Sequence, residues 1–286
     1  MLKSHILCHK VKARGVTPSS SCPKRVIMEP IFELEVTKID DGKRAVKTDI
    51  VVREIKLDIV LNGKRIASLM ATPLDQKALC VGYLRAENII KDMSDIKSIK
   101  LLEDGMRVEI EAHSDEKSIK KLNSEGVVVS GCGKGVSANI DPDAIEAKVI
   151  KSDFAIKSDK LSQAMGQFYT ECPLYEETGC VHTAKLYVDE NNHFIGEDIA
   201  QHNTIDKAVG KAMMSGMDIS NSFLMVSGRL SSEMVAKAVM HSIPILASRT
   251  ASTCLGVMIA KKFDLTLIGF VRGKRMNIYA NPQRIV

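Results

Sequence analysis

From residue 223 onward, short apolar runs alternate with segments of helical periodicity. The apolar runs are Phe223–Val226, Ile243–Ala247 and Leu265–Phe270, and the helical segments cover about 232–241 and 252–262. Continuous rather than alternating apolar runs are typical of parallel strands that are buried on both faces and joined by right-handed crossovers. A final run, Met276–Ala280, follows a turn around Gly273 and predicts an antiparallel hairpin. We therefore predict an α/β sandwich over residues 127–286.

The remainder of this α/β region contains further strands and helices. We expect strands at Val127–Ser130, 181–188 and 193–196, and helices near 158–170 and from about Thr204 to Met214. Asn203 and Asp206 have the spacing of an N-cap residue and the N3 position of the second helix, so Asn203 is its predicted cap.

Residues 26–126 predict a smaller N-terminal α+β lobe. Alternating residues over Ile55–Leu61 run into Asn62-Gly63, a typical two-residue hairpin turn, and then into a strand over Arg65–Met70. Thr72-Pro73 begins a helix that extends to about Asn88. A second hairpin, Lys97–Leu102 with Met106–Glu111, precedes a polar linker at 113–126.

The net charge of +5 has a local origin. Residues 1–25 carry six basic residues and no acidic one, which predicts a disordered basic tail. The other 34 Lys and Arg residues balance 35 Asp and Glu residues. Because Trp is absent and only 4% of residues are aromatic, a base-stacking platform for nucleic acid is not expected.

Neither membrane insertion nor secretion is expected. No run of about 18 apolar residues is present, and no apolar stretch follows the basic tail as it would in a secretory signal. The seven cysteines are scattered, odd in number and without a Cys-x-x-Cys pair. We therefore expect a protein of the reducing cytoplasm, with most thiols buried.

Basic residues follow each of the apolar strands. Arg229, Arg249 and the segment Arg272-Gly273-Lys274-Arg275 each come directly after one strand. Because ligands of open α/β sheets bind beyond the carboxyl ends of the strands, these residues predict a site for an anionic, nucleotide-like ligand. Surface arginines bound to helix ends are the alternative.

Cys132 lies in the glycine-rich segment Gly131-Cys132-Gly133-Lys134-Gly135. The glycines predict a flexible loop, and Lys134 favours the thiolate. Such a loop suits a group that must reach two partners, although a turn with an inert cysteine is the alternative. The segment does not match a phosphate-binding loop.

Two other groups of residues could carry chemistry. His202 follows Glu197 and Asp198, so it could move protons or orient an anion. Cys172, Cys180 and His182 could be three metal ligands, but no Pro-Cys-x-x-Cys motif accompanies them and no metal is expected.

Taken together, these segments resemble the FdhD/NarQ family of formate dehydrogenase accessory proteins. The resemblance covers about residues 50–286. Its segments, in the family's order, are Ala71-Thr72-Pro73 through Ile90, Ser130-Gly131-Cys132-Gly133, Thr178-Gly179-x-x-His182, Glu197-Asp198-x-x-x-His202-Asn203-x-x-Asp206-Lys207, Val226-Ser227-Gly228-Arg229 and Gly269–Arg275.

The resemblance implies a cytidine-deaminase-like fold without the deaminase zinc site, and a homodimer. It implies that Cys132 carries a persulfide received from a cysteine desulfurase. The sulfur is then delivered to molybdenum bis(molybdopterin guanine dinucleotide) before the cofactor is inserted into formate dehydrogenase. By this resemblance Phe270, Val271, Arg272, Gly273, Lys274 and Arg275 contact the cofactor, which a guanine nucleotide partly mimics. Arg229 and His202 complete the expected binding set.

The sequence departs from the family pattern in three places. Gly135 stands where the family loop usually has a second cysteine, Ala200-Gln201 replaces the usual Gly-Arg, and Cys180 replaces a glycine. One thiolate still suffices to hold a sulfane sulfur, and Cys180 could stand in for the missing cysteine. A chaperone that binds the cofactor without sulfur transfer is the alternative. A zinc deaminase is a third reading, although no Glu follows His182 as that chemistry requires.

Overall fold

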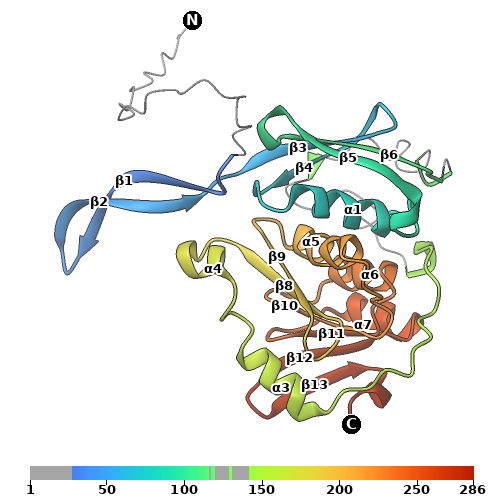
Figure 1. The fold of residues 1–286 in the computed structure, drawn as a ribbon. Coiled ribbons are helices and arrows are strands. Elements are labelled where there is room, and N and C mark those ends of the chain that lie inside the picture. The colour runs from blue at the N-terminus through green and yellow to red at the C-terminus, as the bar shows by residue number, and fades with distance from the viewer. Residues whose placement is uncertain (1–27, 116, 120–128, 131–141) are drawn as a thin grey trace, which may run out of the picture.

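The computed structural model describes residues 28–115, 117–119, 129–130 and 142–286. Cys132, the predicted tail at 1–25 and most of the predicted linker at 113–126 lie outside the described residues. The described part is a mixed α/β fold with three sheets (Figure 1).

The largest sheet has six strands in the order β13-β12-β11-β10-β8-β9. They are β8 (His182–Tyr187), β9 (His193–Asp198), β10 (Phe223–Val226), β11 (Ile245–Ser248), β12 (Thr266–Arg272) and β13 (Arg275–Ala280). The three central strands β10, β11 and β12 are parallel, whereas β13 and β8 join antiparallel on either side. The predicted parallel strands and closing hairpin are therefore confirmed.

Helices cover both faces of this sheet, as the continuous apolar strands predict. One face carries α5 (Gln201–Met214), α6 (Ser232–Met240) and α7 (Cys254–Lys262). On the other face, α3 (Ser158–Gly166) contributes to a second apolar cluster with side chains of β10, β11 and β12. No helix of the described ranges is long and apolar enough to cross a bilayer.

The N-terminal part has a five-stranded sheet in the order β5-β6-β3-β4-β7. Its strands are β3 (Ile55–Leu61), β4 (Lys64–Ala71), β5 (Ile96–Leu102), β6 (Arg107–Ala112) and β7 (Val129–Ser130), and its helix is α1 (Gln76–Ala86). Glycines let α1 and α5 touch backbone to backbone: a Cβ at Gly82 would lie 2.1 Å from the Asp206 carbonyl oxygen. One apolar core therefore contains residues of both sheets.

The third sheet is a hairpin of β1 (Ile31–Asp40) and β2 (Lys43–Val52). It projects away from the rest of the molecule (Figure 1). Asp41 and Gly42 form its turn with φ angles of 46° and 75°, the left-handed pair that a two-residue type I′ turn requires.

The predicted cap of α5 is wrong. The helix begins at Gln201, and Ala200 occupies the N-cap position. Asn203 lies inside the first turn, where its side-chain amide donates to the Met70 carbonyl at 2.9 Å and to Asp198 Oδ1 at 3.0 Å. Asp206 faces Lys237 and His241 instead of capping. Tertiary partners have therefore replaced the local capping pattern.

The helix predicted near 158–170 is also too long. It ends at Gly166, and a short helix that the periodicity did not indicate, α4 (Pro173–Thr178), follows it. Proline at the first helical position starts α4, and Gly179 ends it with a φ of 63°.

Candidate functional site

The carboxyl ends of β10, β11 and β12 meet at one edge of the large sheet. Hydrogen bonds hold the three following segments together there. Ser248 Oγ and Thr250 Oγ1 each donate to the Gly228 carbonyl at 2.7 Å. Arg272 Nε donates to the Arg249 carbonyl at 3.3 Å. The structure thus brings together the three basic segments that the sequence places after separate strands.

The backbone at the end of β12 is strained. Phe270 has a φ of 53° and its N–H donates to the Thr250 carbonyl at 3.0 Å. A left-handed conformation in a bulky residue costs on the order of 1–3 kcal/mol and is concentrated at functional sites. It coincides with a register shift between Gly269 and Arg272, which interrupts the ladder with β13. The shift begins the exposed turn that carries Arg272, Lys274 and Arg275.

This edge is rich in cations that form no ion pair with a carboxylate of the described residues. Arg229, Arg249, Arg272, Lys274 and Arg275 are all exposed. Among the ion pairs within the described residues, none involves these five side chains. Exposed guanidinium groups are suited to bind phosphate oxygens in pairs.

Two histidines border the cationic edge. β8 begins beside the end of β10, so His182 Nδ1 lies 3.3 Å from Ser227 Oγ, a hydroxyl that also accepts from the Thr183 N–H at 3.0 Å. His202 is in the first turn of α5, with Nε2 2.7 Å from Glu233 Oε2. Burial, and after it the charges of His202 and Arg229, lower the pKa of His182. His182 is therefore a neutral hydrogen-bonding group at neutral pH.

Gln201 connects α5 to the loop after β10. Its side-chain amide donates to the Arg229 carbonyl at 3.0 Å, and a Cβ at Gly228 would lie 2.4 Å from the amide nitrogen. The glycine before Arg229 thus makes room for Gln201. Gln201 is uncharged, and the cations of the edge come from the segments after the strands.

A buried ion pair fixes this end of α5 against the N-terminal sheet. Asp198 Oδ2 lies 2.6 Å from Lys207 Nζ and accepts from the Thr72 N–H at 3.1 Å. Its Oδ1 accepts from the Ala200 N–H at 2.9 Å and from Asn203. Both charged side chains are fully buried. The start of α5, and with it His202, is therefore positioned by contacts to β4 and to the residue after it.

The strand that precedes Cys132 ends close to this junction. Leu69 pairs with Ser130 in the parallel ladder of β4 and β7. The next residue of β4, Met70, accepts the hydrogen bond from Asn203. Ser130 is two residues before Cys132 in the sequence. Cys132 itself lies outside the described residues, so its role stays a prediction.

Cys180 is an exposed free thiol two residues before His182. The chain reaches it from α4, whose first turn is held by Glu197: the carboxylate accepts from the Leu174 N–H at 3.3 Å and the Tyr175 N–H at 2.8 Å. Burial raises the pKa of Glu197. Whether Cys180 approaches Cys132 stays a prediction, because the structure does not describe Cys132.

The proposed metal ligands are not brought together. Cys172 is buried and donates to the Phe168 carbonyl at 3.2 Å, and burial raises the pKa of its thiol to about 11. Cys180 is exposed, and His182 faces Ser227. Within the described part of the chain, no three His, Cys, Asp or Glu side chains could hold a metal ion.

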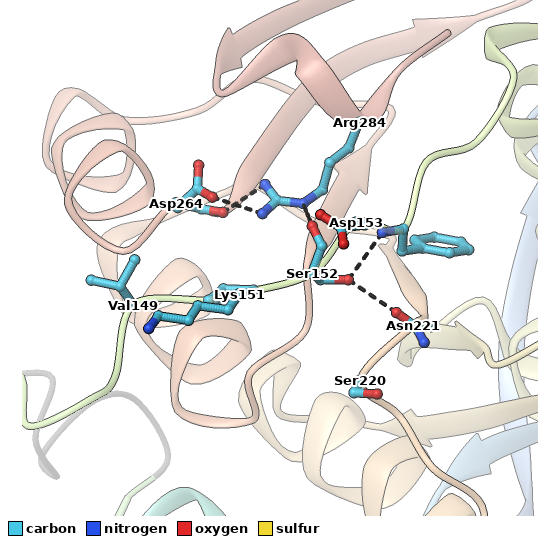
Figure 2. Close-up of a pocket in the computed structure, with 10 residues that line it drawn as sticks. Val149, Lys151, Ser152, Asp153, Ser220, Asn221, Asp264 and Arg284 are labelled. Carbon is cyan, nitrogen blue, oxygen red and sulfur yellow. Dashed lines mark hydrogen bonds and ion pairs between the residues drawn. The ribbon is translucent and has the colours of Figure 1, made fainter.

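A hollow of about 900 Å³ lies at the opposite edge of the sheet, where β10 and β12 begin. Figure 2 shows hydrogen bonds among four of its lining residues, Arg284, Asp264, Ser152 and Asn221. Arg284 donates to the Asp264 carboxylate at 2.7 Å and to the Ser152 carbonyl at 3.3 Å, and Ser152 Oγ donates to Asn221 at 3.1 Å. These bonds hold the C-terminal segment around Arg284 in place.

Known proteins share the family that the motifs along this edge indicate. The model of the FdhD/NarQ family matches residues 52–286. The chain belongs to the FdhD/NarQ family. The segments that form the edge, from Gly179 to Arg275, all fall inside the matched range.

Two curated relatives are each named sulfur carrier protein FdhD. That of Wolinella succinogenes is 38% identical over 92% of this chain and 89% of its own length. The protein of Methanothermobacter thermautotrophicus is 32% identical over 89% of this chain and 98% of its own length. A crystal structure assigned as a formate dehydrogenase accessory protein, from Desulfotalea psychrophila, superimposes with a TM-score of 0.73 at 25% identity. It covers 90% of this chain and all of that one.

Some residues of this candidate site were only partly anticipated from the sequence. Thr183 was not singled out, and Ser227 and His182 were named within their motifs without being expected to meet. They meet because β8 runs antiparallel beside β10, a pairing of strands separated by β9 and α5. The neighbouring motifs at His182 and Arg229 were the available signal, since both lie in segments that resemble the family.

The depressed pKa of His182 predicts a pH effect on stability. An unfolded histidine takes up its proton near pH 6.5, whereas folded His182 resists protonation until lower pH. The free energy of unfolding should therefore fall as pH decreases below 6.5, by at most about 1.4 kcal/mol per pH unit for this one group. His182→Gln should remove that part of the slope.

Denaturant titrations of wild type and variant between pH 5 and 8 measure this slope. His113→Gln, on the N-terminal sheet, controls for the loss of a histidine. An identical slope in wild type and His182→Gln would show that His182 protonates equally in the folded and unfolded chains.

Proposed function

We propose that this chain is a sulfur carrier that serves a formate dehydrogenase. In this role Cys132 receives a sulfane sulfur from a cysteine desulfurase and delivers it to molybdenum bis(molybdopterin guanine dinucleotide). The observation that carries the proposal is the cationic edge around Arg229 and Arg272, whose basic side chains form no ion pair within the described residues. The strand that leads to Cys132 pairs with β4, which contacts the start of α5. The names of the relatives support the proposal.

The cofactor is the cargo, and the chemistry of the edge fits it. Each guanine dinucleotide half carries a pyrophosphate, and Arg229, Arg249, Arg272, Lys274 and Arg275 are exposed donors that form no ion pair within the described residues. In this proposal the turn after Phe270 binds the phosphates. Neutral His182, and His202 beside it, offer ring nitrogens to hydrogen-bond and orient the cargo.

Sulfur loading needs only one thiolate. Attack by Cys132 on the terminal sulfur of a donor persulfide forms the Cys132 persulfide and releases the donor as a thiolate, so the exchange consumes no other reagent. Two extended residues span at most about 7 Å. Ser130 is anchored beside β4 near the start of α5, which supports delivery from Cys132 to the same edge.

The wider expectations are part of the same proposal. We propose a homodimer that works in the cytoplasm, receives sulfur from a cysteine desulfurase and passes the loaded cofactor to formate dehydrogenase. We also propose a cytidine-deaminase-like arrangement for the large sheet, which is supported by helices on both faces and the mixed strand order. A chaperone that binds the cofactor without sulfur transfer is the second candidate, because Gly135 replaces the usual second loop cysteine.

Alanine variants of Arg229, Arg272 and Arg275 test the cargo site. An arginine that forms a paired contact with phosphate should contribute about 2–3 kcal/mol, so each critical replacement should weaken binding of a guanine nucleotide roughly 30- to 150-fold. Calorimetric titration with GDP measures the change. Arg65→Ala, an exposed arginine on β4, is the matched control and should bind as wild type does. If all three edge variants retain wild-type affinity, the nucleotide binds elsewhere.

A further inference from the structure

The β1–β2 hairpin lacks the packing that stabilises the other two sheets. The hairpin has two strands only. Helix α4 contacts β2, but residues 43–49 of β2 are all exposed. Large apolar side chains face solvent: Phe32 is 49%, Ile39 60% and Val46 67% exposed. An isolated two-stranded hairpin is at best marginally stable in water. Its length and apolar content therefore indicate a surface that is covered in the assembled protein.

The register of the hairpin shows which backbone groups are available on β2. Asp40 pairs with Lys43 across a two-residue turn, so the odd-numbered residues of β2 form the hydrogen-bonded pairs with β1. The even-numbered residues consequently direct their N–H and C=O groups outward. In agreement, the Arg53 N–H donates to the Pro30 carbonyl at 2.8 Å, whereas the Ile50 N–H bonds to the neighbouring Asp49 side chain at 3.0 Å.

The outer edge of β2 is complementary to a second copy of itself. Two antiparallel strands related by a two-fold axis pair residues of the same parity, and an axis at Thr48 makes the pairs around the axis favourable, although Arg44 faces Val52 near the strand ends. Thr48 then faces Thr48, and Lys47 faces Asp49 of the other copy on both sides of the axis. Val46 faces Ile50 and Ala45 faces Val51, both apolar pairs. Opposite charges, threonine pairs and β-branched pairs each stabilise neighbouring strands.

Backbone geometry agrees with this axis. The even-numbered residues Val46, Thr48 and Ile50 become the hydrogen-bonded pairs, as the outward direction of their N–H and C=O groups allows, and the Ile50 N–H exchanges its bond to Asp49 for one to the second copy. Lys47 and Asp49 become non-hydrogen-bonded pairs, in which the side chains approach more closely.

The edge of β1 offers no comparable pairing. An axis at Val36 sets Leu34 against Lys38 and Phe32 against Asp40, so charged groups face apolar ones. An axis at Glu35 sets two glutamates against each other. Like charges directly opposite each other destabilise a strand pair.

We propose that β2 pairs antiparallel with β2 of a second copy of this chain about a two-fold axis at Thr48, forming a four-stranded sheet in the order β1-β2-β2-β1. This inference rests on the homodimer in the proposed function and names the surface that forms it. The new sheet leaves β1 at both edges, where Glu33, Glu35, Lys38 and Asp40 discourage further strand addition.

Charge reversal on β2 tests the pairing. Lys47→Asp places a second carboxylate opposite Asp49 at both sites of the dimer, and Asp49→Lys likewise sets two lysine pairs face to face. Each single variant should raise the dimer dissociation constant roughly 30-fold, because two attractive pairs become repulsive. An equimolar mixture of the two variants should restore a dimer, since both cross-strand pairs are then complementary. Analytical ultracentrifugation and native mass spectrometry measure the species.

A cysteine placed on the axis gives a positive test. Thr48→Cys should cross-link two copies under mild oxidation, because hydrogen-bonded residues across antiparallel strands have Cα atoms about 5.5 Å apart, within the range of a disulfide. Thr37→Cys is the matched control: Thr37 is an exposed threonine on β1 of the same hairpin and should not cross-link. Lys38→Asp is the control for charge reversal and should dimerise as wild type does.

The outcomes separate this interface from the wider proposal. A wild-type chain that stays monomeric overturns both the homodimer and the β2 pairing. A wild-type dimer that Lys47→Asp and Asp49→Lys leave unchanged, with no Thr48→Cys cross-link, overturns the pairing alone. Sulfur loading and GDP binding, measured on the same variants, report on the carrier function independently of either result.

Discussion

Cys132→Ser should abolish loading of sulfur on this chain. After incubation with a cysteine desulfurase and cysteine, intact-mass measurement of the wild type should show a gain of one sulfur atom that dithiothreitol removes. The serine variant should show none, because a hydroxyl cannot form the persulfide by exchange. The loss of sulfur loading should be complete, since Cys132 is the one residue to which the sulfur is proposed to bind covalently.

Cys180→Ser is the matched control, because Cys180 is an exposed thiol of the described residues and belongs to the same family-like region. It should load as wild type does if Cys132 works alone. Undiminished loading of Cys132→Ser would overturn the assignment of Cys132 as the carrier, whereas a wild type that takes up no sulfur would favour the chaperone alternative. A disulfide-linked peptide joining Cys132 and Cys180 after mild oxidation would instead show that Cys180 stands in for the cysteine that Gly135 replaces.

Asp198→Ala should be among the most destabilising single replacements in the protein. It leaves the ammonium of Lys207 fully buried without its carboxylate, and it removes acceptors from the Thr72 and Ala200 N–H groups. Breaking a buried pair in this way costs about 3–5 kcal/mol. Urea titration followed by circular dichroism measures the free energy of unfolding.

A second replacement separates the charge effect from general packing loss. Lys207→Met in the Asp198→Ala background removes the unpaired ammonium and should recover part of the lost stability. Asp218→Ala, which removes hydrogen bonds to Ser220 at an exposed turn, should cost much less. A loss below about 1 kcal/mol in Asp198→Ala would contradict the assignment of this pair as the junction of α5 and the N-terminal sheet.

Most helices and strands could be predicted from the sequence because their patterns are local. Continuous apolar runs such as Phe223–Val226 indicated the parallel centre of the sheet, and Asp104-Gly105 indicated the β5–β6 hairpin. The failure at Asn203 has the opposite cause. Its capping pattern is a local rule, whereas the observed partners, Met70 and Asp198, depend on tertiary structure.

The basic character of the candidate site could be predicted from the sequence, but the set of residues that meet there could not. Basic residues after three parallel strands must gather at one edge, so Arg229, Arg249 and Arg272 could be grouped in advance. The position of β8 next to β10 could not be predicted, because two further elements separate these strands in the chain. That placement brings His182 to the edge, and it has no signature in the local sequence.

The contact between α1 and α5 has a consequence for the gene. Gly82 and Gly210 let the two helices meet along their backbones, and one apolar core contains residues of both sheets. Without the other part, the N-terminal part and the α/β part would each expose apolar side chains to solvent. Recombination that inherits one half from a different ancestor would mismatch this seam. We therefore expect the two parts to have evolved together, with substitutions in α1 at this contact compensated by substitutions in α5.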